Sequence, residues 1–176
     1  MTRIRFFVVF SLCLIVPGTG AIAEDILLGQ RGSVLRDNLR RQYTPTDSQS
    51  YDAAREAMFS NIDNVDGEVT CVYTGVKYRT AHIPNHEIVN TEHTWPQSKF
   101  EDGSNSAQMK ADLHHLYVTL NEVNAIRGNF PLAEIPDSET RRWWISADGQ
   151  RNLPSSHIDD YSESIPGAFE PREVHK

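Results

Sequence analysis

The sequence has no apolar run long enough to span a bilayer. Its most apolar stretch, MTRIRFFVVFSLCLIV at residues 1–16, is shorter than the twenty or so apolar residues that a spanning helix needs. Arg3 and Arg5 lie in this stretch, and the small residues Ala21-Ile-Ala23 follow it. This pattern predicts a signal peptide over residues 1–23 and a secreted or periplasmic protein with no membrane contact after cleavage. A retained amphipathic anchor is the alternative.

Cysteine is also scarce. Of the two cysteines, Cys13 lies within the predicted signal peptide, so Cys71 alone would remain. One cysteine excludes an internal disulfide and leaves an intermolecular one open. Because Cys71 lies in the alternating stretch Val69-Thr-Cys-Val-Tyr73, we expect a buried strand residue rather than a reactive thiol.

Positive charge is in deficit. The chain has 17 basic and 24 acidic residues, a formal net charge of −7. Loss of Arg3 and Arg5 with the signal peptide would leave 15 against 24, or −9. Nonspecific affinity for nucleic acid comes mainly from Lys and Arg, so a broad phosphate-binding surface is excluded. Any nucleic-acid site must be local.

Repeats, low-complexity tracts and long linkers are absent as well. Cleavage after Ala23 would leave 153 residues, since 176 minus 23 is 153, which is enough for one domain with a modest core. We therefore expect one domain over residues 24–176, and a monomer.

Two helices are predicted near the N-terminus. The first begins after a possible cap at Ser33, stops at Pro45 and places apolar residues at steps of four: Leu35, Leu39 and Tyr43. The second begins at a cap at Ser50 and has one apolar stripe: Ala54, Met58 and Ile62.

Extended segments follow. Asp66-Gly67 predicts a turn before a strand at 68–74, and residues 76–90 are expected to be irregular. Further strands are predicted at 89–95, ended by Pro96, and at 113–118, with a loop at 101–106 between them.

A short helix is predicted after the last of these strands. Thr119 and Glu122 have the spacing of a capping box, and Gly128 is suited to end the helix after Arg127. Beyond residue 132 we expect loops with at most short strands. The pair Trp143-Trp144 favours a core position, with a stacking and phosphate-binding surface that includes Arg141 and Arg142 as the alternative.

Strand, loop, strand and short helix is the order of elements in a ββα-metal finger. The sequence therefore predicts an α+β fold, a small mixed domain with a ββα-metal finger and N-terminal helices. On the first strand, His93 can take a proton from water. Glu92 and, on the helix, Asn124 offer the hard oxygen ligands that suit Mg²⁺.

Each of these residues also has a structural interpretation. On the predicted strand, His114 and His115 would point to opposite faces, so at most one can face a metal. Asn124 can be a surface residue, and Arg127, which would share a helix face with Asn121 and Asn124 and contact a phosphate, can instead pair with Asp112 or Glu122. Taken singly, the structural interpretations are favoured. A zinc peptidase is disfavoured because the sequence has no HExxH motif.

Longer strings change this balance. NTEHTWPQSKF at 90–100 and MKADLHHLYVTLNEVNAIRGNFPLAEI at 109–135 resemble the endonuclease I family of secreted bacterial nucleases. The resemblance also includes CVYTG at 71–75 and FEPREVHK at 169–176. It implies a sugar-nonspecific, single-metal endonuclease that cleaves DNA, with RNA as a further substrate, and leaves 5′-phosphate ends.

The resemblance also implies roles for single residues. His93 would be the general base, and Glu92 and Asn124 would bind a divalent ion, usually Mg²⁺, with Mn²⁺ or Ca²⁺ as alternatives. His114 would orient the site and Arg127 would contact phosphate. Some relatives carry an arginine between the two strands that contacts the scissile phosphate; residues 101–108 contain none, so further phosphate contacts are assigned to other polar residues: Lys99, Lys110 and Asn129.

Relatives usually continue past FEPREVHK into a helix that packs on the core, so the resemblance implies a C-terminally truncated nuclease domain. Truncation gives a second functional hypothesis: a noncatalytic remnant that binds nucleic acid or a partner. Turnover of nucleic acid separates the two hypotheses, because the remnant would bind without cleaving.

Overall fold

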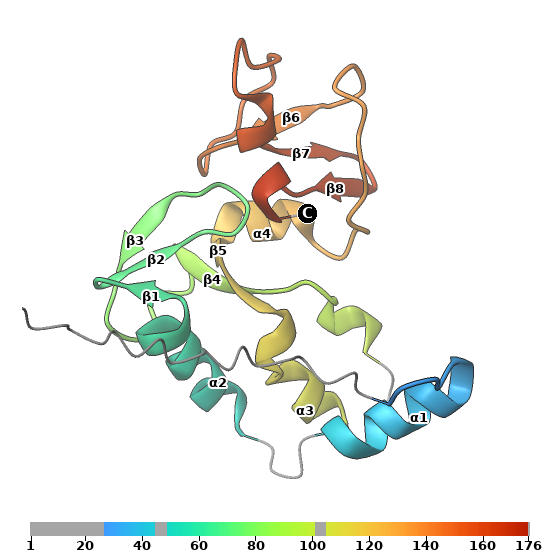
Figure 1. Cartoon of the computed structure of the whole chain (residues 1–176). Helices are drawn as coiled ribbons and strands as arrows, with labels where there is room; N and C mark the ends of the chain where they lie inside the picture. Colours follow the sequence, from blue (N-terminus) through green and yellow to red (C-terminus); the bar gives the residue numbers. More distant parts are fainter. Residues whose placement is uncertain (1–26, 45–48, 101–104, 176) are drawn as a thin grey trace, which may run out of the picture. The chain divides into compact units, whose positions relative to one another are not determined.

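A computed structural model of the chain describes residues 27–44, 49–100 and 105–175 (Figure 1). The chain divides into two compact units, Met1–Pro45 and Thr46–Lys176. The predicted signal peptide at 1–23, the predicted stop at Pro45 and most of the predicted loop at 101–106 lie outside the described residues.

In the first unit, helix α1 spans Gly32–Tyr43, which confirms the first predicted helix. The predicted cap is wrong. The helix begins one residue before Ser33, and the capping position is Arg31, whose side chain makes no capping hydrogen bond. None of the residues of α1 is buried.

The second unit begins with helix α2, Tyr51–Ala57, which continues as a π-helix, η1, over Met58–Ile62. The predicted cap is confirmed: Ser50 Oγ accepts a hydrogen bond from the Ala53 backbone N–H at 3.2 Å. Ala54 and Met58 are buried as expected, but Ile62 is 60% exposed. The wider π-helical turn rotates Ile62 away from the stripe that an α-helix would have continued.

A three-stranded antiparallel sheet follows, in the order β1 (Asn64–Val65), β2 (Glu68–Thr70) and β3 (Lys77–Arg79). The predicted turn is confirmed, since Asp66 and Gly67 join β1 to β2 with φ angles of 55° and 82°. Strand β3 lies in the stretch that was expected to be irregular.

The predicted strand at 68–74 is too long. It ends at Thr70, and the next residues turn back so that the Gly75 N–H donates to the Cys71 carbonyl at 2.9 Å. Val69, Cys71 and Tyr73 are buried as expected, but Val72 and Thr74 are buried as well, so the alternation does not hold.

Strands β4 (Val89–His93) and β5 (Leu116–Leu120) form an antiparallel pair in which Val89 lies opposite Leu120 and His93 opposite Leu116. The pair confirms the strand predicted at 89–95. The strand predicted at 113–118 is displaced, because Leu113–His115 form a 3-10 helix, η3. The Asp112 side chain accepts from the His114 N–H and favours this local turn over a strand. The prediction that His114 and His115 occupy opposite strand faces is therefore wrong.

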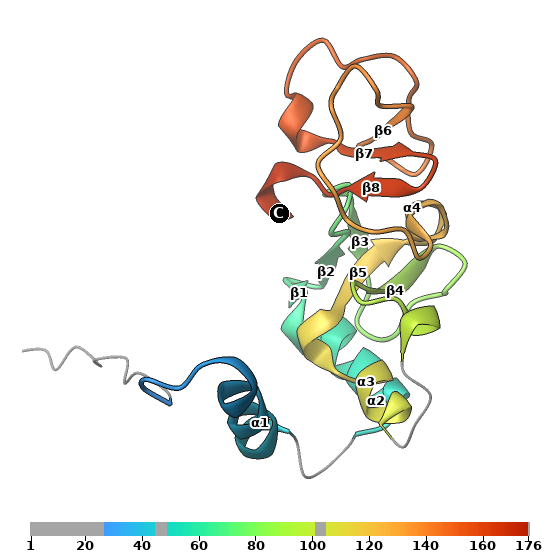
Figure 2. The ribbon, with the colours of Figure 1, turned by 90° about the vertical axis from the view of Figure 1, so that its right-hand side faces the viewer.

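Helix α4 spans Asn121–Arg127 and ends before Gly128, as predicted. Thr119 does not cap it. Thr119 belongs to β5, and its hydroxyl donates to the Leu120 carbonyl within the core. The capping position is Leu120, which has no side-chain hydrogen bond to the helix. Figures 1 and 2 both show α4 between the β4–β5 pair and the C-terminal sheet.

That C-terminal sheet has the order β6 (Arg142–Trp144), β7 (Ser162–Ile165) and β8 (Ala168–Glu170). Its strands are short, as expected, and both Trp143 and Trp144 are 1% exposed. The core interpretation of the tryptophan pair is confirmed, and buried rings at this position cannot form a stacking surface.

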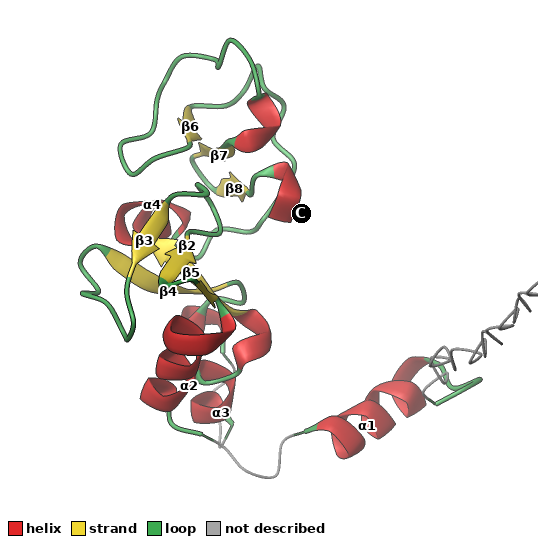
Figure 3. Ribbon diagram, turned by 60° about the vertical axis from the view of Figure 1, so that its left-hand side comes forward, coloured by secondary structure: helices red, strands yellow, loops and turns green. Residues whose placement is uncertain are grey.

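The remaining described elements are short. They are the 3-10 helices η2 (Gln97–Lys99), η4 (Ile158–Asp160) and η5 (Glu173–His175), and helix α3 (Ser106–Lys110). Helices α2 and α3 lie at one end of the β4–β5 pair (Figure 3). Small antiparallel sheets and separate helices make the fold α+β, as predicted. Among the described residues, no helix is both long and apolar enough to cross a membrane.

Candidate active site

A pocket of about 220 Å³ opens where β4 meets helix α4. Its walls come from the end of β4, from the segment that follows it and from the last turn of α4: Thr91, Glu92, His93, Pro96, Gln97, Ser98, Asn124, Arg127, Gly128 and Asn129. Strand β4 ends at His93 and helix α4 begins at Asn121, 28 positions later since 121 minus 93 is 28, and the antiparallel return of β5 brings them together. The pocket therefore contains both predicted metal ligands and the predicted base.

Glu92 is the most enclosed acidic group at this site, with 1% of its surface exposed. The Tyr73 hydroxyl donates to its Oε1 at 2.7 Å, and Arg127 Nε lies 3.2 Å from the same oxygen. Burial raises the pKa of the Glu92 carboxyl, while Arg127 and the Tyr73 hydrogen bond lower it. A buried carboxyl of this kind is stabilised as the anion when a cation is close.

His93 is held between two polar partners. Its Nε2 lies 3.0 Å from the Lys110 carbonyl oxygen, which can only accept, so Nε2 carries the proton. Nδ1 lies 3.1 Å from the Gln97 side-chain amide nitrogen and is the acceptor of that contact. Burial lowers the pKa of His93, which favours the neutral ring. A neutral imidazole whose Nδ1 carries no proton is able to accept one there, once the Gln97 amide shares or leaves that position.

Asn124 joins the helix to the strand. Its amide nitrogen Nδ2 donates to the Thr91 carbonyl at 3.3 Å. That hydrogen bond uses the amide nitrogen and leaves the amide oxygen Oδ1 as a potential ligand. Asn124 is therefore positioned by Thr91, the residue that precedes Glu92 on β4.

Arg127 is buried, with 2% of its surface exposed, and it pairs with Glu92 rather than with Asp112 or Glu122. Its terminal nitrogens also donate to backbone carbonyls: Nη1 to His93 and Gly128, and Nη2 to Thr94 at 2.6 Å. These contacts fix the guanidinium behind the end of β4. A contact with phosphate stays a prediction.

The other predicted residues are distributed differently. Asn129 lines the pocket, and its amide donates to Ser98 Oγ at 3.2 Å. Lys99 is exposed at the end of η2, and the Lys110 ammonium lies 4.6 Å from the centre of the Tyr51 ring. Neither lysine lines the pocket.

His114 does not line the pocket either. Its side chain is 92% exposed, and its Nδ1 lies 2.7 Å from Asp112 Oδ1. The neighbouring His115 is closer to the base: its ring centre lies 5.5 Å from that of His93, and its Nε2 lies 2.6 Å from the Met109 carbonyl oxygen. Of the two histidines, His115 is thus the one that packs on His93.

Sequence reasoning missed two residues at this site, Tyr73 and Gln97. Tyr73 lies in an alternating stretch that predicts a strand residue and no chemical role, and Gln97 lies four residues after His93 in a segment with no regular period. Their roles depend on contacts with Glu92 and His93 that a pattern of residues along the chain does not contain.

The donor set bears on the kind of metal that the pocket suits. Within the described ranges, no group of three or more His, Cys, Asp or Glu side chains is arranged to hold a metal ion. Glu92 and Asn124 instead offer one carboxylate and one amide oxygen. Such a pair fits Mg²⁺, which usually keeps several waters and binds only one or two protein oxygens.

A sequence model of the endonuclease I family matches residues 30–176 of the chain. The match covers the whole second unit, part of the first and every residue of the pocket. It defines the class of the protein as a nuclease, a hydrolase that acts on nucleic acid. The chain belongs to the endonuclease I family. No match was found among curated proteins or among solved structures.

Proposed function

We propose that this protein is a secreted or periplasmic endonuclease that hydrolyses phosphodiester bonds of DNA, and also of RNA, without sequence specificity and with one divalent ion. In this proposal β4, β5 and α4 form a ββα-metal finger. The observation that carries the proposal is that Glu92, His93 and Asn124 line one and the same pocket. Membership of the endonuclease I family supports the nuclease activity itself.

Glu92 and Asn124 would hold the ion, with Mg²⁺ as the first choice and Mn²⁺ or Ca²⁺ as alternatives. The fit rests on how the side chains are held: the contacts of Tyr73 and Arg127 with Glu92 are both made to Oε1, and the Asn124 hydrogen bond uses its amide nitrogen. A bound divalent ion supplies positive charge that stabilises the pentavalent phosphate and the leaving oxygen.

His93 would act as the general base. Because the Lys110 carbonyl holds the proton on Nε2, Nδ1 is the atom that can take a proton from the attacking water. Gln97 contacts this atom and lines the same pocket, so its side chain has to share Nδ1 with that water or move aside. The proton then resides on His93 while the P–O bond breaks.

A plasmid-nicking assay in Mg²⁺ tests the role of His93. His93→Ala should lower the cleavage rate by about 10²- to 10⁴-fold, which is the usual contribution of a general base. His86→Ala is the matched control, because His86 is exposed and does not line the pocket. Equal rates for wild type and His93→Ala would overturn the mechanism.

Asn124→Ala tests the metal site in the same assay. Loss of one oxygen ligand should raise the Mg²⁺ concentration at half-maximal activity while the protein keeps its fold, as checked by circular dichroism. An unchanged Mg²⁺ dependence would remove Asn124 from the ligand set. Nucleic-acid binding by the wild type without cleavage at any Mg²⁺ concentration would instead favour the noncatalytic alternative.

A further inference from the structure

Tyr73 makes a contact that the proposed mechanism does not use. It lies in the turn after β2 and is 1% exposed, and its hydroxyl donates to Glu92 Oε1 at 2.7 Å. The residue is not part of the pocket wall, so it reaches the carboxylate from the core side. A tyrosine hydroxyl that is buried against a carboxylate is a hydrogen-bond donor to it.

The same oxygen has a second partner from another element. Arg127 Nε lies 3.2 Å from Glu92 Oε1, and the rest of its guanidinium is fixed by the carbonyls of residues 93, 94 and 128. Tyr73 and Arg127 thus meet on the same carboxylate oxygen, Oε1. The two oxygens of Glu92 therefore have different surroundings.

This difference matters because the last torsion of a glutamate side chain is broad and roughly twofold. A carboxylate without partners would turn about this torsion, and the direction in which its oxygens face the pocket would vary. Partners that hold one oxygen select one rotation, and groups of this kind behind a metal ligand commonly change metal affinity by 10- to 100-fold when they are removed.

We propose that Tyr73 is a positioning residue for the metal ligand: its hydroxyl, together with Arg127, holds Glu92 Oε1 so that Oε2 is presented to the divalent ion. The inference rests on the proposed function, because it takes Glu92 to be a ligand.

Tyr73 is itself held by the C-terminal sheet. Its carbonyl accepts a hydrogen bond from Ser162 Oγ on β7 at 2.7 Å, and its ring packs edge-on against Phe169 of β8, with 4.7 Å between ring centres. Substitution of Tyr73 by Phe removes the hydroxyl and keeps this packing. The variant therefore isolates the contact with Glu92.

The test is isothermal titration of the full chain with Mn²⁺ as the probe ion. The dissociation constant of Tyr73→Phe should be at least about tenfold above that of wild type. Tyr78→Phe is the matched control: it removes a tyrosine hydroxyl on the neighbouring strand β3, outside the pocket, and should bind Mn²⁺ like wild type. Glu92→Gln should bind Mn²⁺ more weakly than every other variant.

Melting in EDTA and in Mn²⁺ separates positioning from a general loss of stability. The metal-induced rise in melting temperature compares each variant with its own metal-free state. This rise should be smaller for Tyr73→Phe than for Tyr78→Phe, even if both variants have a lower melting temperature than wild type in EDTA. In the nicking assay, high Mn²⁺ should restore cleavage by Tyr73→Phe, because its base and both ligands are intact.

The possible failures are distinguishable. If Glu92→Gln binds Mn²⁺ as wild type does, the proposed function loses its metal ligand. If Glu92→Gln loses the ion but Tyr73→Phe matches wild type in both titration and melting, the positioning role of Tyr73 is wrong and the proposed function stands.

Discussion

At the scale of single residues, burial decides what each polar group of this protein does. Glu92 and Arg127 are both almost fully buried and stabilise each other, whereas His114, the other predicted catalytic histidine, is largely exposed. Removal of one member of a buried pair leaves an uncompensated charge and is strongly destabilising. Variants that conserve shape are therefore the informative ones at this site.

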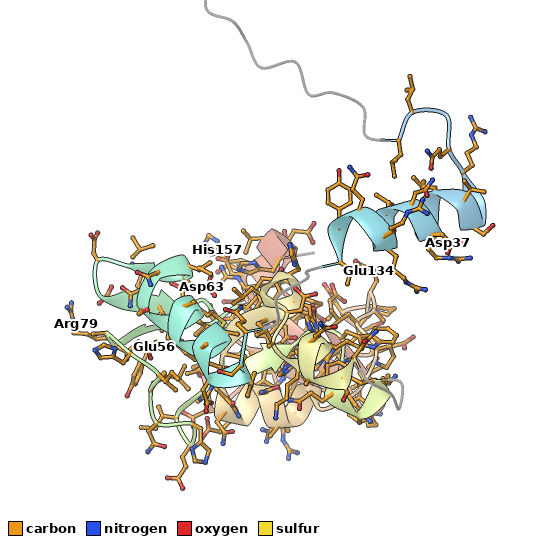
Figure 4. The ribbon with its side chains drawn as sticks, turned by 90° about the horizontal axis from the view of Figure 1, so that it is seen from below. Asp37, Glu56, Asp63, Arg79, Glu134 and His157 are labelled. Carbon is orange, nitrogen blue, oxygen red and sulfur yellow. The ribbon has the colours of Figure 1, made fainter. Side chains whose placement is uncertain are left out.

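Asp63 carries the clearest pH dependence of stability. It follows η1 (Figure 4), and burial raises the pKa of its carboxyl. The folded protein therefore binds this proton more tightly than the unfolded chain does, and stability falls as the pH rises from the unfolded pKa to the folded one. Asp63→Asn should be more stable than wild type at pH 7, and the difference should shrink toward pH 4.

Urea denaturation at the two pH values measures this. Asp137→Asn removes the same charge from an exposed turn and should change the midpoint less. A midpoint for Asp63→Asn that lies below that of wild type at pH 7 would contradict the prediction.

At the scale of elements, the end of α4 is the most constrained turn near the pocket. Gly128 has φ 54° and ψ −121°, a combination that side chains with a Cβ rarely adopt. Its carbonyl also accepts from Arg127 Nη1 at 3.0 Å. The helix thus ends in a conformation that helps to fix the arginine behind Glu92.

Gly128→Ala should lower the free energy of unfolding by about 1–3 kcal/mol, the usual cost of a strained backbone conformation. Space is not the obstacle, since the nearest atom to an added Cβ would be the Ala125 carbonyl oxygen at 3.6 Å. Ala125→Ser, on the exposed face of the same helix, should stay within about 0.5 kcal/mol of wild type. Equal effects of the two substitutions in urea denaturation would contradict the assignment of strain.

At the scale of the second unit, two segments that are far apart in the sequence meet next to the site: the turn at 71–75 and the C-terminal sheet. The turn at 71–75 meets the start of β7 and the segment after β8: Ser162 Oγ of β7 donates to the Tyr73 carbonyl and accepts from the Arg172 N–H. A side chain at Gly75 would overlap the Arg172 guanidinium. The C-terminal sheet is in this way connected to the residues behind Glu92.

Ser162→Ala should destabilise the protein by about 1–3 kcal/mol, because it leaves the buried Tyr73 carbonyl and the half-buried Arg172 N–H without their partner. Ser155→Ala, at an exposed position, is the control and should have little effect. Urea denaturation followed by tryptophan fluorescence measures both, since Trp143 and Trp144 lie in the same sheet. Wild-type stability for Ser162→Ala would show that this link contributes nothing.

Much of this protein follows from local sequence. Several elements were predictable because the residues that indicate them lie close together in the chain: the spacing of apolar residues, the turn residues and the residues that end a helix. These elements are helices α1, α2 and α4, strand β4 and the turn at Asp66-Gly67. The α+β class and the membership of the endonuclease I family were also predictable. Sequence patterns misplaced the cap at Ser33, and they also erred at Thr119 and at the Asp112–His115 turn, where side chains bond to other backbone groups than predicted.

The sequence by itself determined which chemical groups are present: a Glu-His pair at the end of a strand, and Asn124 on a short helix. Tertiary structure alone decided their surroundings, because antiparallel pairing of β4 with β5 and burial behind α4 bring distant residues onto the same atoms. Tyr73 and Arg127 meet on Glu92 Oε1 from segments 54 residues apart, since 127 minus 73 is 54. Hydrogen bonds and burial depend on which residues are close in space, so the spacing of residues along the chain does not predict them.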